Sequence, residues 1–323
     1  MLRIVSSLLV AQLLLVSTSS AQTIGEVRDQ IRNDLRENQF AGGLVTLIML
    51  SSEMELSGIN LKIDDEAGTE ISALVLPFNY TFHPFESPRT GIYTEGVIGC
   101  SVMDQGGPDL FNGDDPAIAT AYDTEWRTYG GLLGIGPERH LSKELSVAAI
   151  AQVGVSYIEN RTTYSGPGAD ISSQIFDGLL FNWNAWAVTY GVAARLHWRR
   201  ELGSGRAIQF TGRYDVRWTD SIVTDDVAQE FSTMSELTTM RMQLSGLTGI
   251  SLGDFPLGWR THTGISYIKP SETADPFGVI EVGGGFDLLT RKALPYVDGM
   301  TLGGAVFLGD GIAGWTVGIG VIF

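Results

Sequence analysis

The fold is decided by the last stretch of the chain, Ala313-Gly314-Trp315-Thr316-Val317-Gly318-Ile319-Gly320-Val321-Ile322-Phe323. Every second residue from Trp315 to Phe323 is large and apolar, whereas the residues between them are Gly or Thr, with Ile322 as the one exception. Successive side chains of a β-strand point to opposite sides, so this alternation predicts a strand with one apolar face and one close-packed face. A strand that separates lipid from the lumen of a barrel needs these two faces.

The same ending resembles the C-terminal signature of bacterial outer-membrane β-barrels. In that signature a terminal aromatic residue and alternating apolar residues form the segment that the barrel-assembly machinery recognises. The resemblance implies that this machinery is a partner during biogenesis and that the mature protein lies among outer-membrane lipid and lipopolysaccharide. The residues that it assigns to the assembly signal are Trp315, Val317, Ile319, Val321 and Phe323.

The N-terminus predicts export. Residues 1–21 contain one positive charge at Arg3, an apolar run from Ile4 to Val16, and the small residues Ser19-Ser20-Ala21. This is the pattern of a secretory signal peptide, and we expect cleavage before Gln22. No later stretch reaches the roughly 18 apolar residues of a membrane-spanning helix. The sequence therefore predicts an integral protein of the bacterial outer membrane, exported by a cleaved signal peptide.

Composition excludes some alternatives. The formal net charge of −16 argues against a nucleic-acid partner, which requires basic surfaces. Cys100 is the only cysteine, so no intramolecular disulfide can form, and we expect it to be a small packing residue.

A helix is predicted directly after the signal peptide. Thr23 and Glu26 have the spacing of a capping box, and the following apolar residues recur at helical spacing. Sixteen residues of helix span about 24 Å, close to the roughly 25 Å apolar height of an outer-membrane barrel. We therefore expect residues 22–41 to thread or plug the lumen of a barrel formed by residues 42–323. The alternative is a short periplasmic or surface helix.

From Gly43 onward the pattern is one of strands and turns, without a second helical pattern. Even strand numbers are the rule in bacterial single-chain barrels, so we predict an all-β transmembrane barrel of about 12 antiparallel strands, with 10 and 14 as alternatives. The predicted strands are Gly43–Asp64 (crossing once), Glu70–Phe82, Gly91–Val102, Thr120–Gly136, Leu141–Tyr157, Asn182–Arg200, Ile208–Trp218, Thr238–Leu252, Gly258–Tyr267, Gly278–Leu289, Met300–Leu308 and Ala313–Phe323. Long connections, outside the cell, alternate with short periplasmic turns such as Pro137–His140.

The strand from Asn182 to Arg200 indicates the width of the membrane. Trp186 and Trp198 share its outer face, twelve residues apart, which is roughly 40 Å along a strand. Tilted by about 45°, this distance projects to about 28 Å, the separation of two aromatic girdles. The residues predicted to form the girdles are Trp186, Trp198, Trp218, Trp259, Tyr267 and Trp315.

The opposite faces of the same strands carry charges, which predicts a charged lumen. The predicted lumenal set is Arg195, Arg199, Arg213, Asp215, Arg217, Arg241, Arg260, Glu281 and Asp287. A functional interpretation is a constriction, or a network that holds the helix. The alternative is a solvated or mutually paired interior, which is the default for such barrels. Inward glycines, such as Gly283 and Gly318, suggest a bare wall against which the helix packs closely.

The signal peptide, the helix of lumen length, the twelve strands and the terminal Phe323 together resemble the translocator domain of an autotransporter. In that family a twelve-stranded barrel carries an N-terminal helix through its pore. Because Gln22 would start the mature chain almost at the helix, the resemblance is to a solitary barrel without a passenger. Secretion and passenger cleavage are therefore not expected here.

Catalytic chemistry is not predicted. An outer-membrane lipase or protease would need His with Ser or acidic partners at the outer rim, but two histidines fall at periplasmic turns and two in the lumen. No spacing matches a metal site, and no cofactor is expected. The expected function is a helix-plugged, non-enzymatic barrel. The alternatives are an open porin-like channel for small solutes and a surface-loop adhesion or interaction protein.

Overall fold

The computed structural model describes residues 23–38, 57–63, 69–84, 89–107, 110, 118–269, 276–290, 299–309 and 311–322. The signal peptide, residues 39–42 after the predicted helix, residues 43–56 and 64 of the first predicted strand, and Phe323 lie outside these ranges. The helical elements among these residues are α2 (Ile24–Asn38), α4 (Ala169–Phe176) and the 3-10 turn η2 (Val227–Gln229). The strands are β1 (Ser57–Ile63), β2 (Glu70–Phe82), β3 (Thr90–Gly107), β4 (Ala121–His140), β5 (Leu145–Ser165), β6 (Asn184–Gly203), β7 (Arg206–Thr224), β8 (Ser232–Leu252), β9 (Phe255–Lys269), β10 (Phe277–Leu289), β11 (Gly299–Gly309) and β12 (Ile312–Ile322).

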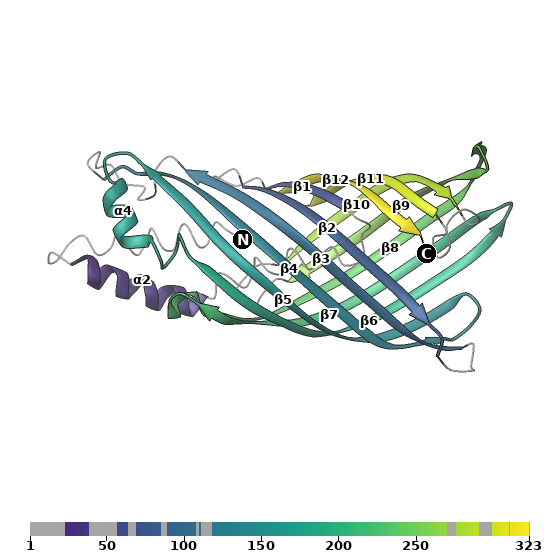
Figure 1. Cartoon of the computed structure of the whole chain (residues 1–323), viewed down its shortest axis with the longest axis horizontal. Coiled ribbons are helices and arrows are strands. Elements are labelled where there is room, and N and C mark those ends of the chain that lie inside the picture. Colours follow the sequence, from purple (N-terminus) through teal and green to yellow (C-terminus); the bar gives the residue numbers. More distant parts are fainter. Residues whose placement is uncertain are drawn as a thin grey trace.

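The strands form a closed antiparallel barrel, which confirms the predicted count of twelve (Figure 1). Each strand pairs with its neighbours in sequence, and β1 pairs with β12 to close the ring, with Asn60 opposite Trp315. Closure leaves no unpaired sheet edge, which is the condition for crossing lipid with strands. Among the described residues, no helix is long and apolar enough to span a membrane.

The outer surface of the barrel is apolar. On the last strand, Trp315, Val317 and Ile319 are each more than half exposed, and the residues between them face inward. Other strands repeat this pattern with Leu, Ile, Val, Met and aromatic residues. A continuous apolar outer surface of this kind is stable only where lipid covers it.

The strands extend further than the sequence indicated. Strand β5 has 21 residues and reaches Ser165, although the predicted strand ended at Tyr157. Polar residues continue the pairing with β4, for example Asp123 opposite Thr163. The first polar residues show where the strands leave the apolar band of the barrel. The backbone hydrogen bonds between the strands continue beyond that point.

The predicted turn Pro137–His140 is wrong, because β4 runs through it and the turn lies at residues 141–144. Pro137 pairs with Ile92 of β3, while the ladder to β5 is interrupted between Ile135 and Glu138. A Cβ on Gly136 would lie 1.7 Å from the carbonyl oxygen of Ala149. The strands approach closely here and tolerate a residue that donates no backbone hydrogen bond.

The two ends of the barrel differ. At one end, which we call the short-turn end, the connections include residues 141–144, 204–205 and 253–254. At the other, the long-loop end, are the connections 108–120, 166–183 and 225–231. The interior toward the long-loop end contains a buried apolar cluster, which was not predicted. Its members are Ile71, Val75, Val97, Met103, Trp126, Leu132, Ile158, Trp183, Ala185, Ala187 and Phe231.

Helix α2 begins with the predicted capping box, which is confirmed. The backbone N–H of Thr23 donates to Glu26 Oε2 (2.8 Å), and that of Glu26 donates to Thr23 Oγ1 (3.3 Å). The placement of the helix differs from the expected position in the lumen. Its main contacts are with η2 and α4 at the long-loop end, where Figure 1 shows it beyond the strands. The alternative of a surface helix describes these residues better.

The helix lies there because the long connection after β5 contains a second helix, α4, which the sequence analysis did not predict. Ile31 of α2 is 2% exposed and packs with Ile175, Phe176 and Phe181. Helix α4 has only eight residues. This length is too short for helical periodicity of apolar residues to be recognised in the sequence. The apolar stripe of α2 is therefore covered by a loop helix and not by the lumen wall.

Candidate functional site in the lumen

Alternation along β7 places the first part of the site. Arg213, Asp215 and Arg217 are separated by two residues each, so all three point inward, and all are 3% exposed or less. The neighbouring strand β6 presents Ala193 opposite Asp215 and Gly191 opposite Arg217. A Cβ on Gly191 would lie 3.0 Å from Cγ of Arg217. Small residues on β6 therefore leave the room that the long side chains of β7 fill.

These three residues belong to a balanced ionic group with Glu95 of β3 and Gln152 of β5, which we call the paired network. Arg213 donates to Glu95 through Nη1 (2.5 Å) and Nη2 (2.7 Å), and to Asp215 through Nε (2.6 Å) and Nη2 (2.8 Å). Arg217 Nη2 donates to Asp215 Oδ1 at 2.9 Å. Two guanidinium groups face two carboxylates, so the charges cancel.

Gln152 completes the paired network. Its amide nitrogen donates to Glu95 Oε1 (2.9 Å) and Asp215 Oδ1 (3.1 Å), and its carbonyl oxygen accepts from Arg217 Nε (3.3 Å). Among the described residues, no buried side-chain atom of this network is without a hydrogen-bond partner. Buried charges are tolerated when they are paired and hydrogen-bonded in this way.

Arg195 and Arg199, two of the six predicted charges outside the paired network, have partners of their own. The guanidinium of Arg195 lies over the ring of Tyr93, 4.8 Å from its centroid. Arg199 is exposed near the short-turn end, where it forms an ion pair with Glu201 (2.9 Å). Neither residue contributes to a common constriction with Arg213.

The remaining predicted charges form a second group on β8, β9 and β10, which we call the open cluster. His262 Nε2 lies 2.8 Å from Glu281 Oε1, and Arg241 Nη2 lies 3.9 Å from the same oxygen. Arg260 Nε lies 3.6 Å from Asp287 Oδ1, and its guanidinium also contacts Thr301. The ion-pair distances of Arg241 (3.9 Å) and Arg260 (3.6 Å) are longer than those of Arg213 in the paired network (2.5 and 2.6 Å).

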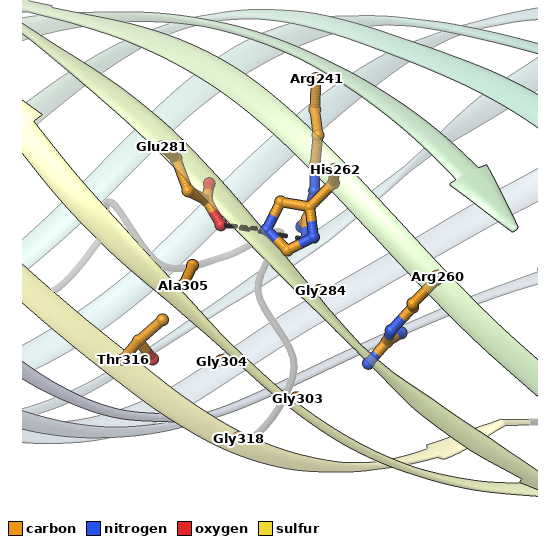
Figure 2. Close-up of a pocket in the computed structure, with 10 residues that line it drawn as sticks. All are labelled: Arg241, Arg260, His262, Glu281, Gly284, Gly303, Gly304, Ala305, Thr316 and Gly318. Carbon is orange, nitrogen blue, oxygen red and sulfur yellow. Dashed lines mark hydrogen bonds and ion pairs between the residues drawn. The ribbon is translucent and has the colours of Figure 1, made fainter.

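The open cluster borders a cavity of about 40 Å³ (Figure 2). Its other walls are the small residues Gly284, Gly303, Gly304, Ala305 and Gly318, with Thr316 of β12. Within the part of the chain that the structure describes, four buried polar atoms in this region have no hydrogen-bond partner: Arg241 Nε, His262 Nδ1, Asp287 Oδ1 and Thr316 Oγ1. Each unpaired buried polar atom costs about 1–3 kcal/mol unless a ligand or water satisfies it. No metal-binding group of His, Cys, Asp and Glu occurs in the described part of the chain.

Outside the membrane-spanning segments, charges join the helices of the long-loop end. Arg28 donates to the carbonyl oxygens of Gln174 (2.7 Å), Ile175 (3.1 Å) and Asp177 (3.0 Å). Carbonyl oxygens at the C-terminal end of a helix such as α4 need a donor from outside the helix. Arg32 pairs with Asp226 next to η2, and this hydrogen bond raises the pKa of Arg32.

Asp177 also orders the outer end of β5. It accepts a hydrogen bond from the hydroxyl of Tyr164 (3.0 Å). Burial and the adjacent Asp177 carboxylate raise the pKa of Tyr164. The hydroxyl therefore remains a neutral donor.

The predicted aromatic girdle residues all lie on the outward-facing side of their strands. Trp186, Trp218, Tyr267 and Trp315 lie toward the long-loop end, whereas Trp198 and Trp259 lie toward the short-turn end. Their contact with the two membrane interfaces stays a prediction. In the C-terminal signal, Trp315, Val317 and Ile319 face outward, and the side chains of Val321 and Phe323 lie outside the described residues.

Sequence reasoning missed Glu95 and Gln152, the two partners of Arg213 and Asp215 on other strands. Glu95 is 3% exposed and lies on the inward side of β3 with Val97 and Tyr93. Glu95 could have been found in the sequence as a single acidic residue on an otherwise apolar strand face. A buried carboxylate needs a cation, so this pattern predicts a partner such as Arg213.

The sequence also matches a family model. The description of this model is "Solitary outer membrane autotransporter beta-barrel domain", and the match spans residues 62–244 of the 323. The chain belongs to this family. The resemblance inferred from the terminal strand, the helix and the strand count is thereby confirmed. Membership of this autotransporter family indicates the bacterial outer membrane. A sequence search of curated proteins found no match.

Solved structures similar to this autotransporter-type barrel include the β domain of the Bordetella autotransporter BrkA, at 14% identity and TM-score 0.49, covering 81% of this chain and 93% of that one. The translocator domain of NalP from Neisseria meningitidis has 11% identity and TM-score 0.47, and the match covers 90% of this chain and 98% of that domain. The transport unit of AIDA-I from Escherichia coli has 8% identity and TM-score 0.49, and the match covers 88% of this chain and 99% of that unit.

Proposed function

We propose that this autotransporter-type barrel is closed to free diffusion in its resting state and has no catalytic activity. The observation that carries the proposal is the burial of inward-facing side chains. Val97, Trp126 and Arg213 face the interior, yet each is 3% exposed or less. The inward face of a water-filled channel would be polar and solvated. Here an apolar cluster and a saturated ionic network occupy part of the space that a permeant would need.

The long-loop end supports the same proposal. Helix α2, α4 and η2 form one assembly, which we call the outer assembly, held by Ile31 in an apolar cluster and by Arg28 and Arg32 in polar contacts. It joins the two connections that follow β5 and β7. Occlusion would then come from this assembly and from the filled interior, rather than from a helix that threads the lumen.

The cellular setting is part of the proposal. We infer export by a signal peptide that is cleaved before Gln22, and insertion among outer-membrane lipid and lipopolysaccharide by the barrel-assembly machinery. Support comes from the apolar outer face of β12, with Trp315, Val317 and Ile319 exposed in one row. A passenger-independent role in the membrane follows from the description of the family as solitary.

Planar-bilayer conductance tests this proposal directly. The mature chain, refolded in detergent, is compared with a deletion of residues 22–39 and with the double variant Arg28→Gln/Arg32→Gln, which removes the polar contacts of α2. The matched control is Arg199→Gln/Arg200→Gln at the short-turn end, where both arginines are exposed. We expect the intact chain and the control to stay closed, and the first two variants to open more often.

A large, steady conductance of the intact chain would show the alternative, an open porin-like channel for small solutes, and the proposal would be wrong. If the intact chain is closed and the deletion stays closed as well, occlusion is confirmed and is assigned to the filled interior. Binding of the folded protein to a surface partner through its long loops would support the third alternative, an interaction protein.

A further inference from the structure

We propose that the cavity of the open cluster binds a small monovalent carboxylate anion, and that binding takes place when His262 is doubly protonated. The cavity opens between β9, β10, β11 and β12, inside the barrel. Its polar lining is made by Arg241, Arg260, His262 and Thr316, with Glu281 on one side. This inference concerns a ligand site and goes beyond the proposed closure of the barrel.

Buried polar atoms at the cavity are unpaired. The side chain of His262 is 7% exposed and Thr316 is 8% exposed, yet among the described residues His262 Nδ1 and Thr316 Oγ1 have no hydrogen-bond partner. Arg241 Nε is also unpaired. Buried polar groups in folded proteins are satisfied in more than about nine cases in ten. Three unpaired groups around one cavity indicate that an occupant satisfies them.

The proton on His262 decides which ring nitrogen can donate to a ligand. Glu281 Oε1 lies near both His262 Nε2 (2.8 Å) and Arg241 Nη2 (3.9 Å), as the dashed lines in Figure 2 show. A carboxylate in this position accepts, so Nε2 is the nitrogen that donates. In the neutral ring Nδ1 is then an acceptor, whereas in the imidazolium both nitrogens donate. Only the imidazolium offers Nδ1–H to an anion.

The charges around the cavity balance when His262 is neutral. The charged groups that face His262 are Arg241 on β8, Arg260 on its own strand, and Glu281 on β10, while Asp287 on β10 pairs with Arg260. The described residues of β11 and β12 that line the cavity are uncharged. With a neutral His262, two positive and two negative charges cancel. Protonation of His262 adds one positive charge, which one monovalent anion balances.

Size limits the occupant. A cavity of about 40 Å³ holds roughly three water molecules at about 10–15 Å³ each. A carboxylate with one or two carbons has a similar size. The glycines at positions 284, 303, 304 and 318 keep this space free of side chains. The small volume favours such a short anion over a larger solute, such as a sugar acid.

Nitrogen NMR of the imidazole rings tests the proposal. The chain is refolded in micelles with ¹⁵N-labelled histidine, and His262→Gln assigns the resonances of His262 among those of the four histidines. Sodium formate is present from refolding onward, so access to the lumen does not limit binding. Sodium gluconate at equal concentration controls for ionic strength and for size. Both salts are titrated at pH 5.5 and pH 8.0.

We expect formate, but not gluconate, to shift the ring nitrogens of His262 saturably. The dissociation constant should be at least about tenfold lower at pH 5.5 than at pH 8.0, because only the doubly protonated ring offers Nδ1–H to the anion. Thr316→Val, which removes the hydroxyl, should weaken binding severalfold. The matched control Thr211→Val, which removes the hydroxyl beside His197 on the other wall, should leave it unchanged. The proposal is overturned by an absent shift, by an equal response to gluconate, or by equal affinity at both pH values.

Discussion

The paired network and the open cluster lie in the same lumen and contain the same residue types, yet their geometries differ. In the paired network Arg213 makes four hydrogen bonds to Glu95 and Asp215, and the contacts are 2.5–2.8 Å long. In the open cluster Arg241 and Glu281 are 3.9 Å apart, and Arg241 Nε has no partner. The first group is complete within the chain, whereas the second is not.

The difference shows that lumenal charge alone does not identify a functional site. Counting charged residues placed both groups in one predicted set. The hydrogen-bond inventory separates them, because a saturated network stabilises the wall and an unsaturated one has capacity for a ligand. Substitutions of arginine and glycine residues in the paired network and in the open cluster test this difference.

The largest expected effect is that of Arg213→Ala. The substitution leaves Glu95 and Asp215 buried without Arg213, with Arg217 and Gln152 as their remaining partners among the described residues. Removing one partner of a buried ion pair costs about 3–5 kcal/mol. The free energy of unfolding, measured by urea titration in lipid vesicles with tryptophan fluorescence, should fall by this amount. The exposed Arg199→Ala is the control and should change it by less than about 0.5 kcal/mol.

A smaller loss of unfolding free energy is expected when a methyl group is added to a glycine beside either group. A Cβ on Gly134 would lie 2.8 Å from Cγ of Glu95, so Gly134→Ala must displace a member of the paired network. Overpacking of this kind costs about 1–3 kcal/mol. Gly303→Ala, which points toward the cavity and meets the carbonyl oxygen of Gly284 at 3.0 Å, should cost less than about 1 kcal/mol. Equal losses of unfolding free energy would mean that the two walls are packed alike.

The smallest effect should come from Arg241→Met. Glu281 keeps its contact with His262, and an unpaired guanidinium nitrogen is removed from the interior. We expect the free energy of unfolding in anion-free buffer to change by about 1 kcal/mol or less. A loss as large as that from Arg213→Ala, in the same urea titration, would show that the open cluster is as complete as the paired network.

Most of the barrel was predictable because a lipid-facing wall imposes a strict period of two. The predicted strand Glu70–Phe82 coincides with β2, and the alternation around Trp315 correctly placed the strand that closes the ring. Strand ends were less predictable. At Pro137 the turn signal was misleading, because one ladder is interrupted there while the other continues.

The candidate site was only partly predictable, because its partners are far apart in sequence. Arg213 and Glu95 are separated by 118 residues, and no local pattern links them. The alternation gave the inward direction of Arg241, Arg260 and Glu281, but the missing hydrogen bonds depend on distances. Helix α2 shows the same limit, because its apolar stripe required a cover without specifying that α4 would provide it.

The ion pair between Arg213 and Glu95 has a mechanical consequence. It joins β7 to β3, which are four positions apart in a ring of twelve, so it acts as a chord across one third of the circumference. That arc can neither flatten nor widen without stretching the chord. Any dilation of the bore must therefore come from the opposite arc, where the inward residues Gly283, Gly303 and Gly318 leave the wall bare.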